Sequence, residues 1–286
     1  MHWTPRRERF RAVLAGARCV HPGSVFDPIS ARIAEDLGFE IGMFAGSTAS
    51  LTVLGAPDLI VLTLSEFAGQ AYRINRAGGL PLLVDADHGY GNALNAMRTV
   101  EELETAGVAA LTIEDTLLPA PFGGGKPQLV PLAEGVGKMR AALAARQDPN
   151  LVIVGRTAAL QITGLDDMLE RVKAYEAAGI DALFVLGVRT RAELDALSSA
   201  VSVPIVLGGA GAAVMDLEYL SARGVRIALQ GQQPIMAAVQ AVHAALKALR
   251  DGTPPAQLSG LASPELMQRV TRDADYKSRT KEFLGG

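Results

Sequence analysis

The stretch ELETAGVAALTIED, residues 102–115, decides the fold, because it joins a helix end to a glycine and then to an apolar strand. The same form returns in KAYEAAGIDALFV (173–185) and in EYLSARGVRIAL (218–229). Glycine takes the left-handed conformation that often closes a helix before the chain turns back. The recurrence is typical of βα units and predicts parallel strands with helices between them.

Eight short apolar runs are bounded by Gly, Pro or charge, which favours buried strands over helices. We expect strands near Arg18–Val20, Ile41–Ala45, Leu80–Asp85, Ala109–Glu114, Leu151–Arg156, Ala182–Leu186, Pro204–Leu207 and Val225–Leu229. Amphipathic segments such as 133–145 and 166–178 separate them. Eight evenly spaced units predict a single (β/α)₈ TIM-type barrel over residues 1–250, with a doubly wound sheet as the alternative.

The C-terminal part has a different pattern. An apolar stripe at helical spacing is followed by the interruption DGTPP at 251–255, and Ser263-Pro264 is a typical helix start. We expect residues 251–286 to form a linker and an appended helix, which packs on the barrel or on a neighbouring subunit. The residues of the stripe are Ile235, Ala238, Val239, Val242, Leu246 and Leu249.

Composition excludes several classes of protein. The 27 Lys and Arg against 30 Asp and Glu leave no broad basic surface for nucleic acid. The single cysteine, Cys19, excludes an intramolecular disulfide and any multi-cysteine metal site. No apolar secretory segment follows the basic start, and no apolar run approaches about 18 residues. We therefore expect a cytoplasmic protein without nucleic-acid or membrane partners.

Polar residues follow the predicted strands at the end where a barrel carries its active site. Asp85 and Asp87 come directly after one strand, and Glu114 ends the next. Carboxylates packed together repel one another unless a cation lies among them, and all-oxygen ligands favour Mg²⁺, with Mn²⁺ possible. The alternative is ordinary helix capping and ion pairs with Arg156 or Arg98.

Two further strand ends carry groups that suit an anionic substrate. Arg156 can clamp a carboxylate through two parallel hydrogen bonds, or it can form a buried ion pair with Glu114. Ser47 and Thr48 can offer hydroxyl and backbone N–H groups to an anion, or they can simply cap a helix.

The motifs VFDPISARIAEDLGFE (25–40), GSTAS (46–50), LVDADHGYGNALNAMRTVEELETAGVAALTIED (83–115) and GRT (155–157) together resemble the isocitrate lyase/phosphoenolpyruvate mutase superfamily. ADHGYGNALNAMRTV (86–100) and TIEDTLLPAPFG (112–123) resemble its Mg²⁺-dependent oxaloacetate decarboxylase branch most closely. The resemblance runs in order from about Arg18 to Ala248.

This resemblance implies an α/β barrel whose last helix is often exchanged between subunits of a homodimer or homotetramer. It implies Mg²⁺ held by Asp85, with Asp87 and Glu114 acting directly or through water. Ser47, the backbone after it and Arg156 would bind the carboxylate of a small α-keto acid. Asp58 falls where mutase-type members place a polar residue on a mobile gate.

The chain departs from the family pattern at specific places. Residues 117–123 replace the segment that carries a catalytic cysteine in the lyases and a Lys/Asn pair in the mutases. A tyrosine and a histidine expected after strands 7 and 8 are Ala210 and Gln232 here. Gln232 cannot transfer a proton near neutral pH, but it can donate a hydrogen bond to a substrate.

The sequence thus predicts Mg²⁺-dependent decarboxylation of oxaloacetate to pyruvate through an enolate. Asp85, Glu114 and Arg156 are the predicted catalytic residues, and water or Tyr90 is the candidate proton donor. Two alternatives remain: C–C lyase or phosphonopyruvate-type chemistry, and a barrel that binds keto acids without turnover. Residues 119–131, with three consecutive glycines, are either a gate or a flexible surface loop.

Overall fold

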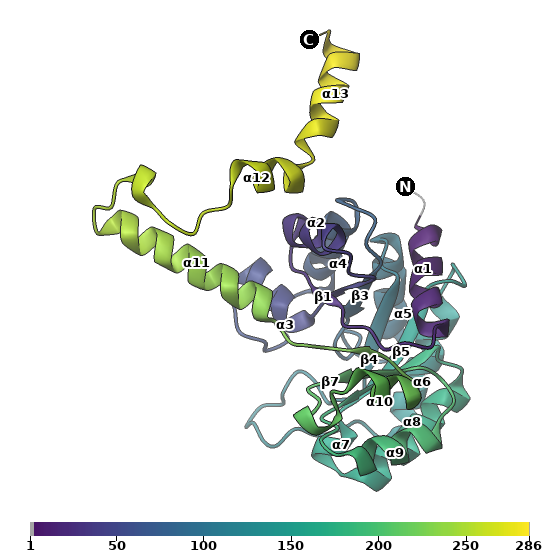
Figure 1. Ribbon diagram of the computed structural model, residues 1–286. Coiled ribbons are helices and arrows are strands. Elements are labelled where there is room, and N and C mark those ends of the chain that lie inside the picture. The colour runs from purple at the N-terminus through teal and green to yellow at the C-terminus, as the bar shows by residue number, and fades with distance from the viewer. Residues whose placement is uncertain (1–2, 286) are drawn as a thin grey trace. The chain divides into compact units, whose positions relative to one another are not determined.

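The computed structural model describes residues 3–285 of the 286-residue chain (Figure 1). The chain divides into two compact units, Met1–Gly231 and Gln232–Gly286. This division groups helix α11 (Gln233–Arg250) with the segment that follows it, whereas the sequence analysis assigns residues 232–250 to the barrel. The two units are described separately.

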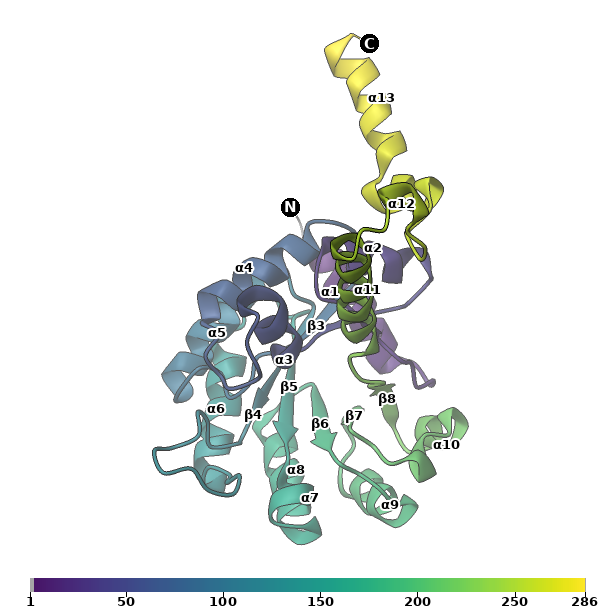
Figure 2. The same cartoon turned by 90° about the vertical axis from the view of Figure 1, so that its left-hand side faces the viewer.

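The first unit contains one sheet of eight parallel strands in chain order, and Figure 2 shows its later strands, from β4 (Ala110–Glu114) to β8 (Val225–Ala228), side by side. A parallel bridge between Val20 and Ile227 joins the last strand back to the first segment. The predicted (β/α)₈ barrel is therefore confirmed. The strands are β1 (Gly23–Ser24), β2 (Gly42–Phe44), β3 (Leu82–Asp85), β4 (Ala110–Glu114), β5 (Val152–Thr157), β6 (Ala182–Leu186), β7 (Ile205–Gly208) and β8 (Val225–Ala228).

Seven predicted strands coincide with observed ones, and the first is wrong by a few residues. Arg18–Val20 is not a strand, because within it only Val20 pairs with the sheet, whereas β1 begins at Gly23. A two-residue strand such as β1 leaves little apolar pattern in a sequence, whereas the apolar residues near Cys19 have the pattern of a strand.

Helices connect the strands and cover the outside of the sheet. Gly107, Gly179 and Gly224 follow helix ends with φ of 86°, 97° and 77°, which confirms the left-handed turns inferred from the repeat. The elements are α1 (Thr4–Ala15), α2 (Pro28–Asp36), α3 (Gly46–Ala49), the π-helix η1 (Ser50–Leu54), α4 (Leu64–Asn75), α5 (Ala93–Thr105), α6 (Leu132–Ala145), α7 (Ala159–Ile162), α8 (Leu165–Ala178), α9 (Arg191–Ala200), the 3₁₀ turn η2 (Ala212–Val214) and α10 (Leu217–Ala222).

The core has two layers. Alternate strand residues such as Leu82, Val84 and Leu111 point outward and pack against the helices. The other strand residues, among them Leu83 and Val152, fill the barrel interior. Both faces of each strand are thus apolar, which explains the continuous apolar runs in the sequence.

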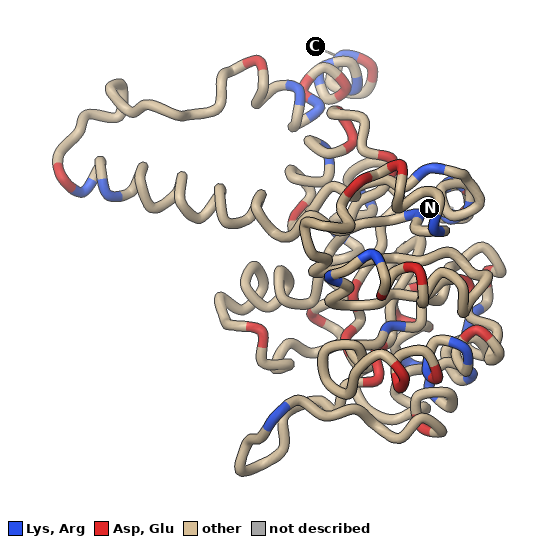
Figure 3. The backbone as a smooth tube through the Cα atoms, turned by 60° about the horizontal axis from the view of Figure 1, so that its bottom comes forward, with Lys and Arg blue, Asp and Glu red and all other residues tan. Residues whose placement is uncertain are grey.

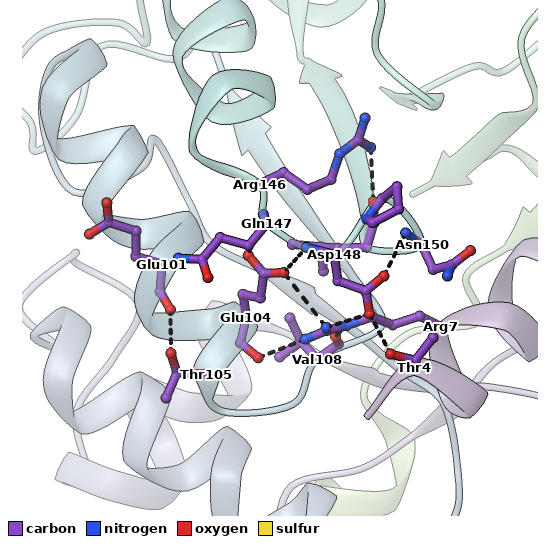
Figure 4. A network of polar contacts seen from close by, with 12 residues as sticks. Thr4, Arg7, Glu101, Glu104, Thr105, Val108, Arg146, Gln147, Asp148 and Asn150 are labelled. Atoms are coloured by element: carbon purple, nitrogen blue, oxygen red, sulfur yellow. Dashed lines mark hydrogen bonds and ion pairs between the residues drawn. The ribbon is translucent and has the colours of Figure 1, made fainter. Parts of the chain in front are cut away.

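Helix α1 closes the amino-terminal end of the barrel, a role that the sequence analysis did not foresee. Its Phe10 joins the interior core. Its Arg7 donates hydrogen bonds to the carbonyl oxygens of Glu104 (2.7 Å) and Val108 (3.1 Å) and to the carboxylate of Asp148 (2.8 Å; Figure 4). Because Val108 and Asp148 lie just before β4 and β5, these contacts hold α1 at the amino-terminal ends of these two strands.

Charged residues are interspersed along the first unit, with Asp and Glu segments among the Lys and Arg segments (Figure 3). No helix within residues 3–285 is long and apolar enough to cross a membrane.

The second unit consists of α11, the 3₁₀ turn η3 (Pro255–Gln257), α12 (Pro264–Thr271) and α13 (Asp273–Leu284). Ser263 caps α12 by accepting a hydrogen bond from the Leu266 amide at 3.2 Å, as its position before Pro264 predicts. Part of the apolar stripe on α11 is exposed, in particular Val239, Val242 and Leu246.

Candidate active site

The carboxyl ends of β3, β4 and β5 bring the central polar residues together. Asp85 is the last residue of β3, and Glu114 is the last of β4. Glu114 stands directly opposite Arg156 of β5 in the parallel register. Because neighbouring parallel strands end at one edge, residues distant in sequence become neighbours, as the sequence analysis expected.

These residues line a cavity of about 640 Å³ at this end of the barrel. Its polar lining combines predicted residues with three that the sequence analysis did not single out, Thr116, Lys126 and Gln161. The residues that line it are Ser47, Asp58, Leu59, Ile60, Asp85, Asp87, Glu114, Thr116, Leu118, Ala120, Lys126, Pro127, Arg156, Ala158, Gln161, Ile162 and Leu186.

Arg156 is the central cation of the site. One of its terminal nitrogens contacts the Asp85 carboxylate, and the other lies 3.3 Å from Oε2 of Glu114. The Arg156 guanidinium also lies over the Phe184 ring, 5.4 Å from its centroid, while its Nε is buried without a partner in the described part of the chain. The predicted ion pair between Arg156 and Glu114 is therefore present, while the role of Arg156 as a carboxylate clamp stays a prediction. Arg98 instead pairs with Glu101 and Glu102 on α5.

Two threonines orient the carboxylates. Thr112 donates a hydrogen bond to Asp85 at 2.8 Å, and Thr116 donates one to Glu114 at 2.9 Å. The alternating pattern of β4 places Thr112 and Glu114 on one face, so a polar residue two positions before Glu114 was the available signal.

Asp87 is held in a tight turn after β3. Its φ of 48° lies in the left-handed region, which Asp adopts more readily than most residues. Its carboxylate packs against Gly46, where a Cβ would lie 2.7 Å from Oδ1. Its carbonyl oxygen accepts a hydrogen bond from the Glu114 amide at 2.8 Å. The turn therefore fixes Asp87 beside both neighbouring strands.

The electrostatics of the cluster favour an added cation. Burial, together with the nearby carboxylates of Asp85 and Glu114, raises the pKa of Asp87 to about 8. Burial also raises the pKa of Glu114, although Arg156 acts in the opposite direction. One arginine therefore does not balance the three carboxylates.

The donor set suits Mg²⁺ bound largely through water. No three Asp, Glu, His or Cys side chains in residues 3–285 already stand in an arrangement that surrounds a metal ion. Mg²⁺ characteristically keeps several waters and uses one or two carboxylates. The surplus of buried carboxylates supplies oxygen donors of the kind that such an ion uses.

The remaining predicted site residues lie at different depths. Ser47, on α3, lines the cavity, but Thr48 is fully buried behind it and its hydroxyl has no partner within residues 3–285. Asp58 lines the cavity, and burial with the nearby Asp85 charge raises its pKa. Gln232 directly precedes α11 and belongs to the second unit, so its substrate-binding role stays a prediction. Ala210 is not among the residues that line this cavity.

Behind the cavity lies a layer of buried polar groups. Lys138 of α6 donates a hydrogen bond to the carbonyl oxygen of His88 at 3.0 Å and steadies the turn after Asp87. Burial, with the Lys138 charge nearby, lowers the pKa of His88 to about 4. Burial and the Asp87 charge raise the pKa of Tyr90, whose hydroxyl is buried without a partner in the described residues.

The segment after β4 folds as a short hairpin that forms one wall of the cavity. A bridge between Thr116 and Leu129 and a hydrogen bond from the Val130 amide to the Asp115 carbonyl (2.8 Å) fix its base. The three glycines at its tip, Gly123–Gly125, all have positive φ. Residues 119–131 therefore border the cavity, and their role as a gate stays a prediction.

Comparison with known proteins decides the family. Residues 10–250 match the model of the phosphoenolpyruvate phosphomutase family. The chain belongs to this family. The resemblance stated from the motifs around Asp85 and Glu114 is thereby confirmed.

Curated family members resemble the whole chain. A protein named oxaloacetate decarboxylase from Rhodopseudomonas palustris (strain BisB18) is 62% identical over 285 residues, which cover 100% of this chain and 99% of that protein. One of the same name from Bradyrhizobium diazoefficiens is 61% identical, with the same coverage. The likeness therefore extends through the C-terminal unit, beyond the residues matched by the family model.

Solved structures of phosphoenolpyruvate phosphomutase family enzymes share the fold. A phosphoenolpyruvate phosphomutase from Streptomyces platensis subsp. rosaceus has a TM-score of 0.86 at 29% identity, covering 97% of this chain and 99% of that one. A phosphonopyruvate hydrolase in complex with oxalate and Mg²⁺ has a TM-score of 0.83 at 29% identity, covering 98% and 99%. An oxaloacetate acetylhydrolase with the inhibitor 3,3-difluorooxalacetate has 0.85 at 27% identity, covering 99% and 98%.

Proposed function

We propose that this protein is a Mg²⁺-dependent carboxy-lyase that converts oxaloacetate to pyruvate and CO₂. The observation that carries the proposal is the buried cluster of Asp85, Asp87 and Glu114 around Arg156 in one cavity. The name shared by relatives at 61–62% identity over essentially the full length supports the same reaction. Mn²⁺ is the alternative ion.

Asp85 would hold the ion directly, and Asp87 and Glu114 would hold it directly or through water. When bound, the ion supplies positive charge that stabilises the negative charge developing on the keto oxygen. Thr112 and Thr116 keep the Asp85 and Glu114 carboxylates oriented for this task. The ion in the phosphonopyruvate hydrolase complex supports the choice of Mg²⁺.

Arg156 and Ser47 would bind and orient the carboxylate next to the keto group. The bond from C3 to the distal carboxylate then breaks, its electron pair passes to the carbonyl to form the enolate of pyruvate, and neutral CO₂ departs. A proton added at C3 completes pyruvate. Water is the proposed donor, because Tyr90, with a raised pKa, does not line the cavity.

Thiol-dependent lyase chemistry is less well supported. The chain's one cysteine, Cys19, is buried, does not line the cavity, and has its pKa raised to about 11 by burial. Residues 117–123 offer no thiol and no lysine either, so neither isocitrate-type cleavage nor phosphoryl transfer has its expected groups there.

Pyruvate formation from oxaloacetate by the purified protein with Mg²⁺ tests the proposal. Because free Mg²⁺ alone decarboxylates oxaloacetate, the Asp85→Ala variant at equal Mg²⁺ is the blank. The proposal requires that wild type exceed this variant by orders of magnitude and that EDTA remove the difference. Equal rates would refute it, and oxalate binding would then distinguish a barrel that binds keto acids without turnover.

We also propose that the protein forms a homodimer or homotetramer through its C-terminal unit. Val239, Val242 and Leu246 give α11 an exposed apolar stripe of the kind that interfaces bury. Light scattering of the full chain measures the state directly. Its cytoplasmic location stays a prediction.

A further inference from the structure

We propose that Lys126 recognises the distal carboxylate of the substrate, the one that leaves as CO₂. This inference deepens the proposed function and rests on it. It assigns to the hairpin after β4 the part of the cavity that distinguishes a dicarboxylate from a simple α-keto acid.

The first argument is the count of charges in the cavity. Four carboxylates line it, from Asp58, Asp85, Asp87 and Glu114, against the cations of Arg156 and Lys126 only. Arg156 is already shared by Asp85 and Glu114. With the proposed ion and Arg156 both assigned to the keto-acid end of the substrate, Lys126 is the remaining cationic side chain in the lining for the distal carboxylate.

The second argument is that the Lys126 ammonium group has no interaction partner within residues 3–285. It forms no hydrogen bond or ion pair with any residue that the structure describes, although it lines a cavity rich in carboxylates. Lys138, in contrast, is buried and donates to the carbonyl of His88. An unpaired lysine at the edge of a binding cavity is free to pair with an incoming anion.

The third argument is the position of Lys126 in the hairpin. The Thr116–Leu129 bridge closes the base of the hairpin two residues after Glu114, the last residue of β4. Lys126 lies between the glycines of the tip and Pro127, and a residue before proline is restricted to extended conformations. Lys126 thus lies on the returning arm of the hairpin, outside residues 117–123, and its side chain lines the cavity.

The chemistry predicts a specific kinetic effect. An ion pair between Lys126 and the distal carboxylate forms in the ground state and disappears as that carboxylate becomes neutral CO₂. Such an interaction strengthens substrate binding and is lost in the transition state, so it raises the barrier of the chemical step from the bound substrate. Removing it should therefore raise KM for oxaloacetate about tenfold, the range of a charge-assisted hydrogen bond, and should not lower kcat, so that kcat/KM falls by less than KM rises.

The test compares Lys126→Met with wild type, using two probes in the presence of Mg²⁺. Calorimetry gives the Kd of each probe. Oxalate resembles only the carboxylate and keto end of the substrate, whereas 3,3-difluorooxaloacetate also has the distal carboxylate. We expect Lys126→Met to weaken 3,3-difluorooxaloacetate about tenfold, to leave oxalate unchanged, and Lys126→Arg to recover most of the loss. Lys173→Met, which removes an exposed lysine of α8 outside the cavity, is the matched charge control.

Three results would overturn the inference: unchanged binding of both probes, equal loss of both probes, or the same loss in Lys173→Met. The last two would indicate a general effect of net charge or of folding. The binding measurements do not depend on turnover, so absent decarboxylation by wild type would refute the proposed function while still deciding the role of Lys126.

Discussion

The two ends of the barrel each hold an arginine among carboxylates, but they pair these carboxylates with donors to different extents. At the amino-terminal end, the Arg7 network (Thr4, Arg7, Glu104 and Asp148) has a donor for every carboxylate oxygen (Figure 4). At the carboxyl-terminal end, the Arg156 cluster (Asp85, Asp87, Glu114 and Arg156) has three carboxylates but one cation, and its donors pair with Asp85 and Glu114 rather than with Asp87.

The pKa values separate these two regions. Burial alone would raise the pKa of Asp148, but hydrogen bonds from Arg7, the Asn150 amide and Thr4 lower it to about 2. In the Arg156 cluster, burial and neighbouring carboxylates raise the pKa of Asp87 to about 8. Complete pairing stabilises the fold at one end, while incomplete pairing at the other leaves room for an ion and a substrate.

The largest expected effect is on catalysis and follows from Arg156→Met. Loss of the guanidinium removes the partner of the substrate carboxylate, so kcat/KM for oxaloacetate should fall about 1000-fold, or about 4 kcal/mol. Steady-state pyruvate formation measures the loss. A decrease of less than about tenfold would show that the Arg156 cluster is structural, like the Arg7 network.

Arg7→Met should instead act on stability. Removing one partner of a buried ion pair leaves Asp148 and Glu104 uncompensated, which costs about 3 kcal/mol of unfolding free energy. Urea denaturation measures this cost, and kcat of the variant below its unfolding range should stay within about twofold of wild type. A large fall in kcat without a stability change would contradict the contrast between the two ends.

Mg²⁺ should bind at the Arg156 cluster and not at the Arg7 network. At about 100 times its Kd, a ligand that binds the native state adds about 2.7 kcal/mol, so Mg²⁺ should raise the Tm of wild type. Asp85→Ala should lose this response, while Asp148→Asn should keep it. Calorimetric melting curves with Mg²⁺ and with EDTA measure both, and an equal response in Asp85→Ala would exclude Asp85 as the main ligand.

The smallest effect concerns acid stability. The folded-state pKa of Asp148 is depressed from 3.8 to about 2, so its stabilisation is present above about pH 4 and is lost as pH falls towards 2. Discounted for its partly exposed side chain, the contribution is about 1 to 2 kcal/mol. Asp148→Asn should therefore flatten the decline of unfolding free energy between pH 4 and 2, and an unchanged decline would contradict it.

Much of the barrel was predictable because parallel strands are buried on both faces. Runs such as Leu82–Val84 and Val152–Val154 carry that signal locally, and Gly107 and Gly179 mark where helices end. The Val20 bridge and the role of α1 were not predictable, because both depend on contacts with strands far along the chain.

The candidate site divides in the same way. Asp85, Glu114 and Arg156 could be found from the sequence, because strand ends are recognisable and a barrel gathers them at one face. Thr48 was expected to contact the substrate but is fully buried, because the short helix α3 turns its side chain away from the cavity. Lys126 was missed, because nothing local distinguishes a lysine in a glycine-rich loop from any exposed lysine.

The sequence by itself determined the order of strands and helices and the three strand ends that carry Asp85, Glu114 and Arg156. It did so because periodicity and strand boundaries are properties of neighbouring residues. Only the tertiary structure decided which carboxylates have hydrogen-bond donors, completely around Arg7 and incompletely around Arg156. This pairing depends on burial and on donors from distant segments, which no local pattern encodes.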